Sequence, residues 1–242
     1  MDNLAAPPAE FPRSVSVSLG AVLATAGGFL DSYTYLTRHG VFATSQTGNI
    51  VLFGIESAQG EWTRAVRHLP PLLAFIAGVL AAETLKRPGV ARLVRWPARA
   101  ALVIEIAALL VVGALPESTP DAIVTLTIAF VCSVQVTMFR TLLRWQYNTT
   151  MTTGNLRSAA QAVYAALADR DAEAALRARA FTIILAAFTG GAILGGACST
   201  WWGVRAAWVA AACLVLGLWL FTADHLPPRH ASPPPTAAGG RQ

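Results

Sequence analysis

The stretch Thr44-Ser45-Gln46-Thr47-Gly48-Asn49 places a polar Thr-Gly-Asn triplet in the middle of a moderately apolar segment, 36–58. The triplet recurs as Thr153-Gly154-Asn155 in a second such segment, 140–164, directly after Thr149-Thr150-Met151-Thr152. About three turns of helix-compatible sequence follow each triplet. Two apolar segments interrupted at matching positions indicate that the chain repeats itself.

The segments that follow the two triplets also correspond. Ala74-Phe75 with Gly78 matches Ala187-Phe188 with Gly191 at nearly the same spacing from the triplet. Self-similarity of this kind must be settled before the fold is predicted. It divides the chain into a first repeat, 14–116, and a second repeat, 121–222.

The composition favours a membrane protein. Of the 242 residues, 55% are hydrophobic and only 13% are charged, whereas soluble domains are roughly 25% charged. The apolar residues form blocks close to the roughly 20 residues that cross a hydrocarbon core about 30 Å thick. Six such blocks predict an all-α membrane protein with six spans: Ser14–Tyr35, Leu69–Leu85, Ala100–Leu115, Asp121–Phe139, Ala180–Thr200 and Ala206–Thr222.

Several classes of function are disfavoured by the sequence. The net charge of +5 comes from basic residues in short loops, where they orient spans rather than bind nucleic acid. The cysteines Cys132, Cys198 and Cys213 lie in apolar blocks without C-x-x-C spacing and are interpreted as packing residues. No metalloprotease, nucleophile-elbow or P-loop motif is present. We therefore expect no enzyme, no metal and no cofactor, and the lipid bilayer as the main partner.

The two ends of the chain are predicted to be tails. Residues 1–13 lack the basic, apolar and cleavage regions of a signal peptide, so the first block is expected to remain as a span. Residues 227–242 are rich in Pro, Ala and Gly, a composition typical of disorder. We expect disordered tails at 1–13 and 227–242.

Charge in the loops predicts the topology. The loop 86–99 holds five basic residues and no acidic one, whereas the loop 116–121 holds no basic residue, which places the first inside and the second outside. If the Thr-Gly-Asn segments enter and leave on one side, six spans form two inverted three-helix repeats with both termini in the cytoplasm. If they cross, eight spans form parallel repeats. The positive-inside bias favours the inverted arrangement.

An interrupted segment inside a membrane needs protein or water around its free backbone groups. Glycine permits the break, and Thr and Asn can cap the half-helix that follows. In the first repeat this half-helix is expected over Thr47–Ala58, about 18 Å long. Two half-helix N-termini facing each other near the midplane resemble the small-solute sites of transporters. The expected site residues are Thr47, Gly48, Asn49, Thr153, Gly154 and Asn155. The alternative interpretation is a pair of structural turns.

Isolated polar residues in the spans add candidates. Asp31 is the clearest charge in a span, and its counterpart in the second repeat is Gln135. Such residues are costly in lipid and are candidate functional groups, although Asp31 could instead pair with Arg38. Glu105 is expected to reach toward the basic loop 86–99. Arg38 and its counterpart Arg144 are expected to anchor the interface or flank a pore mouth.

These motifs together resemble the YoaK-like family of bacterial multi-pass membrane proteins. The resemblance rests on Gly28-x-x-Asp31, Phe42 and the first triplet, and in the second half on Gln135 and the run 149–154. It implies six spans and a location in the cytoplasmic membrane, and it implies no substrate. Val136 departs from the asparagine expected there.

We expect a channel or secondary transporter whose small solute binds between the two Thr-Gly-Asn breaks, with Asp31 and Gln135 as further polar groups. Helix N-termini favour an anion or a carboxylate, whereas Asp31 favours a cation, so the charge of the solute stays open. The alternative is a membrane sensor, scaffold or accessory subunit that uses the breaks only as turns. The small-residue seams predict either a homodimer or close packing of helices within the monomer.

Overall fold

The structure is a computed structural model that describes residues 15–91, 94, 96–150 and 152–224. The two expected tails, 1–13 and 227–242, lie outside the described residues, so their disorder stays a prediction. Ten α-helices lie in the described part of the chain. They are α1 (Val17–Thr37), α2 (Gln46–Ala58), α3 (Trp62–Ala65), α4 (Leu69–Leu85), α5 (Pro88–Ala91), α6 (Pro97–Ala114), α7 (Asp121–Met138), α8 (Thr152–Ala168), α9 (Ala172–Trp202) and α10 (Ala207–Asp224).

Short elements connect the helices. Two 3₁₀ turns, η1 (Val66–His68) and η2 (Gly203–Ala206), lead into α4 and α10. A small antiparallel hairpin of β1 (Thr141–Leu142) and β2 (Trp145–Gln146) lies between α7 and α8. Val15 donates to Thr141 and accepts from Leu143, which ties the hairpin to the chain just before α1.

The helices support the prediction of an all-α membrane protein. Within the described residues, four helical segments are long and apolar enough to cross a membrane: Trp62–Leu85, Pro97–Ala114, Asp121–Met138 and Ala172–Ala223. The last of these contains both α9 and α10. Each expected block except Ser14–Tyr35 falls largely within one of these four, and the helix α1, Val17–Thr37, covers most of that remaining block.

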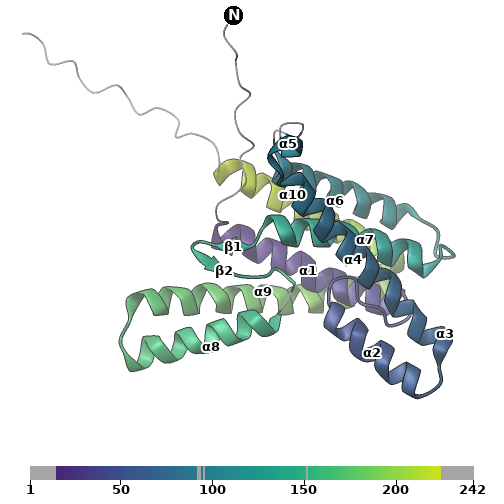
Figure 1. The fold of residues 1–242 in the computed structure, drawn as a ribbon, viewed down its shortest axis with the longest axis horizontal. Coiled ribbons are helices and arrows are strands. Elements are labelled where there is room, and N and C mark those ends of the chain that lie inside the picture. The colour runs from purple at the N-terminus through teal and green to yellow at the C-terminus, as the bar shows by residue number, and fades with distance from the viewer. Residues whose placement is uncertain (1–14, 92–93, 95, 151, 225–242) are drawn as a thin grey trace, which may run out of the picture.

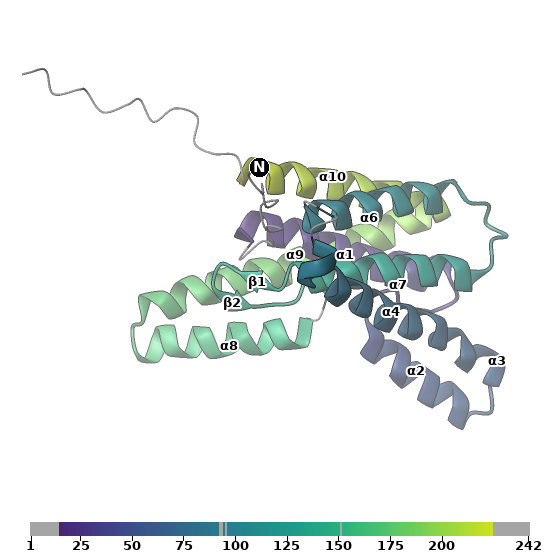
Figure 2. The ribbon, with the colours of Figure 1, turned by 45° about the horizontal axis from the view of Figure 1, so that its top comes forward.

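The helix α1, which is not among these four segments, lies in the centre of the bundle. It packs against α9 along its length and also against α10 (Figures 1 and 2). Its buried residues include Gly27, Gly28, Asp31 and Thr34. A helix whose neighbours are protein can carry small and polar residues that lipid would exclude.

Glycines set the distance between the crossing helices. A Cβ on Gly191 of α9 would overlap the Thr25 carbonyl of α1, and one on Gly28 would overlap the Phe188 carbonyl of α9. At the crossing of α4 and α7, a Cβ on Gly78 would overlap the Ser133 hydroxyl. The small-residue seams are thus used inside the monomer, where they bring backbones into contact.

Two helices diverge from the bundle. In both views α2 and α8 begin close to each other beside α1 and run away on opposite sides (Figures 1 and 2). The helix α8 packs against the N-terminal half of α9, which has 31 residues and is therefore about 46 Å long. That length exceeds the hydrocarbon core of about 30 Å. The helix also begins eight residues before the expected block Ala180–Thr200.

Candidate functional site

The first break lies between α1 and α2 and is held by Asp31. Its carboxylate accepts hydrogen bonds from the backbone N–H groups of Thr44 (2.8 Å) and Ser45 (3.2 Å) and from the Ser45 hydroxyl. One turn further along α1, the Thr34 hydroxyl accepts from the Ala43 N–H at 3.0 Å. The protein's own carboxylate thus occupies the positive end of α2, where an anion is favoured.

The two asparagines of the triplets make the same contacts in both repeats. Asn49 accepts from the Phe42 N–H (3.0 Å) and donates to the Phe42 carbonyl (2.8 Å). Asn155 accepts from the Asn148 N–H (3.3 Å) and donates to the Asn148 carbonyl (2.6 Å). Each side-chain amide therefore replaces a backbone partner for a residue seven positions earlier. Both asparagines are buried.

The other predicted site residues lie in two environments. Thr47, Thr153 and Gly154 are exposed at the first turns of α2 and α8. Gly48 is half-buried, and a Cβ there would press on the Phe42 ring at 2.9 Å. Gln135 is buried on α7, with 2% of its surface exposed.

Both breaks meet the same stretch of α1. A Cβ on Gly27 would lie 3.0 Å from the Thr150 methyl and 3.2 Å from the Thr149 carbonyl, whereas Asp31, one turn on, binds the first break. Thr149 is buried, and its hydroxyl has no hydrogen-bond partner among the described residues. The structure thus brings together Asp31 and the two breaks, but it leaves Thr47, Thr153 and Gly154 at the surface.

His68 is a buried polar residue that the sequence analysis did not select. Its Nδ1 lies 3.3 Å from Asn49 Oδ1 and its Nε2 lies 3.1 Å from Glu56 Oε2. The residue links η1 to both ends of the polar face of α2. Its only signal in the sequence was its position before Pro70-Pro71, at the start of a predicted span.

Glu105 differs from its expected placement. It does not reach toward the basic loop but is buried between helices, 1% exposed, with Cys132 Sγ donating to its Oε1 at 3.3 Å. The helix α6 is apolar on every face, so its sequence has no amphipathic pattern that would show which side chains point into the bundle.

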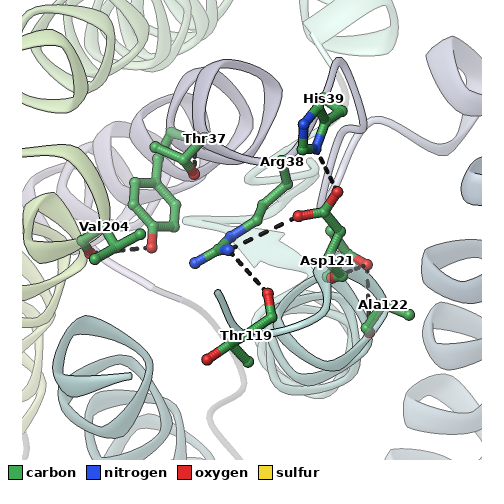
Figure 3. Close-up of polar contacts among 9 residues, drawn as sticks. Thr37, Arg38, His39, Thr119, Asp121, Ala122 and Val204 are labelled. Carbon is green, nitrogen blue, oxygen red and sulfur yellow. Dashed lines mark hydrogen bonds and ion pairs between the residues drawn. The ribbon is translucent and has the colours of Figure 1, made fainter. Parts of the chain in front are cut away.

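A second polar cluster lies where α1 ends and α7 begins (Figure 3). Arg38 is 1% exposed. Its Nη1 donates to the Thr119 carbonyl at 3.4 Å and lies 3.8 Å from the Asp121 carboxylate. His39 Nδ1 lies 2.5 Å from the same carboxylate. Arg144, the repeat counterpart of Arg38, is instead exposed and pairs with Glu173 at 3.3 Å.

The helix α1 ends sharply at this cluster. His39 (φ 53°) and Gly40 (φ 82°) have left-handed backbone conformations that stop the helix and turn the chain back toward Asp31. No three His, Cys, Asp or Glu side chains come together as a metal site would need anywhere in the described part of the chain.

The family of the chain is shown by a family model that matches residues 19–220, described as a protein of unknown function, DUF1275. The chain belongs to the DUF1275 family. No curated protein and no solved structure matches it. The match spans both Thr-Gly-Asn breaks and both glycine seams. It is consistent with the resemblance to the YoaK-like family.

Proposed function

We propose that this protein is a channel or secondary transporter that moves a small anion across the cytoplasmic membrane. The observation that carries the proposal is that two helices, α2 and α8, begin at breaks beside neighbouring turns of α1 and run apart. Helix N-termini buried in a membrane bundle attract negative charge. Breaks of this kind are tolerated only where protein or a wet cavity surrounds them.

The proposal includes six spans, α1, α4, α6, α7, α9 and α10, in two inverted repeats with both termini inside. Three observations support it. The helix α1 packs on α9 and α10 as α7 packs on α4 and α6. The asparagine contacts are the same in both breaks, and matching glycines set the two main helix crossings.

The two breaks differ in charge, and this difference favours an anion over a cation. At the first break the Asp31 carboxylate already binds the start of α2. At the matching position of α7 the chain has Gln135, which carries no charge. The N-terminus of α8 is therefore the end that can accept a negative group from a solute, with the buried Thr149 hydroxyl, which has no partner among the described residues, as a further donor.

The test compares Gln135→Asp with Gln146→Glu, which adds the same charge on the exposed surface of β2. Thermal unfolding of purified protein is measured with a panel of inorganic anions, carboxylates, amines and amino acids. Bound ligand stabilises by about 2.7 kcal/mol at a hundredfold excess over Kd. We expect one class of anion to raise Tm in the wild type and in Gln146→Glu but not in Gln135→Asp, where the new carboxylate competes.

The anion should also cross the membrane in proteoliposomes that contain the wild type, and more slowly with Gln135→Asp. A Tm shift that persists in Gln135→Asp would show that the anion does not bind at the N-terminus of α8. If no solute changes Tm or crosses, the scaffold or sensor reading takes precedence, because the asparagine contacts alone then explain the breaks.

A further inference from the structure

Glu105 lies in the middle of α6, one of the apolar segments that can cross a membrane. It shares the buried face of that helix with Ala101, Leu102 and Leu109. A carboxyl group at this depth is among the most expensive side chains that a membrane protein can carry. The function proposed above does not use it.

The carboxyl group has one partner. Cys132 Sγ donates to Oε1 at 3.3 Å, while Oε2 is buried and has no hydrogen-bond partner among the described residues. Glu105 takes part in none of the ion pairs found in the same part of the chain.

Among the described residues, the elements that pack on α6 supply no cation to this group. The helix packs on α7, α10 and η2. The titratable group that faces Glu105 from α7 is the Cys132 thiol. On α10, Cys213 donates to the Val22 carbonyl, and Arg205 of η2 is exposed at the end of α6. On α6 itself, Arg99 lies over the rings of Trp96 and Phe221.

Asp31 and Glu105 therefore have opposite environments. Asp31 receives three hydrogen bonds at a helix N-terminus, which stabilise its ionised form. Glu105 has a weak thiol donor and a bare oxygen, and an unpaired carboxylate there would lose its hydration without compensation. The two carboxyl groups therefore differ in how far the protein compensates a negative charge, and Glu105 is the one with the least compensation.

We propose that Glu105 is a proton-binding site inside the helix bundle and exchanges its proton with water when the bundle opens. On release, the O–H bond of the carboxyl group breaks, its electron pair stays on the carboxylate oxygen, and the proton goes to a water molecule. Coupling of this proton to a solute rests on the proposed function, in which one proton and one monovalent anion cross together without net charge.

The proton site is tested by infrared spectroscopy of the wild type and Glu105→Gln in lipid. A protonated carboxyl group has a C=O stretching band that a carboxylate lacks. We expect this band at neutral pH in the wild type, its loss in Glu105→Gln, and its shift when the sample is incubated in D₂O. Glu83→Gln, which removes an exposed carboxyl group from α4, should leave the band unchanged.

Each outcome decides the proposal. If the band is missing in the wild type, Glu105 is ionised and the proposal fails. If the band is present but never shifts in D₂O, the proton does not exchange and the group is a static neutral acid. Should Glu105→Gln not fold, Cys132→Val serves instead, because loss of the thiol donor should move the Glu105 band without removing it.

Coupling is measured with a pH indicator inside proteoliposomes. The anion that stabilises the wild type should carry protons inward with it, and Glu105→Gln should bind that anion equally but move no protons. Anion uptake by the wild type without protons would overturn the coupling and leave the proton site intact. Absence of any transported anion would overturn the proposed function, whereas the infrared result would still decide the role of Glu105.

Discussion

At the scale of single residues, the asparagine of each triplet acts as a substitute for a backbone peptide group. It supplies one acceptor and one donor to a residue that the helix break has left without partners. A buried backbone group without a partner costs about 1–3 kcal/mol. The stability of each break therefore depends on the hydrogen bonds of the asparagine amide and not on the volume of the side chain.

We predict that Asn49→Ala and Asn155→Ala each lower the stability of the protein by about 2–4 kcal/mol, because each change leaves a buried N–H and a buried carbonyl unpaired. Gln59→Ala, which removes an exposed amide just after α2, should change little. The measurement is thermal unfolding in detergent. Equal melting of all three variants would contradict a structural role for the asparagines.

Two substitutions of Asp31 separate the contribution of its charge to stability from the contribution of its hydrogen bonds. Asp31→Asn keeps an oxygen for the Thr44 and Ser45 N–H groups and should lose only the charge at the start of α2, about 0.3–2 kcal/mol. Asp31→Leu leaves those donors unpaired and should lose several kcal/mol. Unfolding curves of the two variants test this order, which would be reversed if Asp31 served only as a cation ligand.

The residue scale also shows what a sequence can reveal. The breaks were predictable because a short, repeated, polar triplet stands out in apolar surroundings. The partners of Asn49 and Asn155 were not, because they are backbone groups that any residue supplies. The placement of Glu105 was predicted wrongly, because a helix that is apolar on every face has no polar side to show which residues face inward.

At the scale of the elements, the crossings of α1 with α9 and of α7 with α4 depend on glycines, because a Cβ atom at these positions would overlap the facing helix. The expected blocks located these helices well, since span length and hydropathy are local properties. They missed the first two turns of α9, because Ala172–Arg179 is polar and resembles a loop by hydropathy.

The glycine seam provides a matched pair of variants on neighbouring residues. A Cβ at Gly191 would overlap the backbone of Thr25, whereas a Cβ at Gly190 would meet nothing within 4 Å. We predict that Gly191→Ala destabilises the protein by about 1–3 kcal/mol through overpacking. Gly190→Ala should be neutral or slightly stabilising, since glycine weakens a helix interior. The measurement is thermal unfolding of both variants. An equal loss of stability in Gly190→Ala and Gly191→Ala would contradict a close contact of α9 with α1 at Gly191.

At the scale of the whole molecule, the six-span and eight-span topologies differ in where the turn between α8 and α9 lies. The six-span arrangement puts that turn inside and the loop after α6 outside. We predict that Ser118→Cys reacts with a membrane-impermeant thiol reagent on intact cells. Arg170→Cys, in the turn, should react only after the membrane is opened. Reaction of Arg170→Cys on intact cells would support eight spans.

The native cysteines suit this experiment. Cys132 and Cys198 are buried, and Cys213 is half-buried within α10. The unmodified chain therefore supplies the background signal, and its reaction with the reagent should be slight. A strong signal from the native chain would require the cysteines to be replaced before the topology is assigned.

The main helix crossings join distant parts of the chain, and this has a consequence for biosynthesis. Asp31 finds its partners in Thr44 and Ser45, which leave the ribosome almost at once after it. The glycine face of α1 can pack only once α9 is made, after the seven helices α2 to α8. During that interval α1 exposes a seam that lipid fills poorly. Nascent chains stopped before α9 should therefore be held by the insertion machinery or degraded, and completion of α9 should release them.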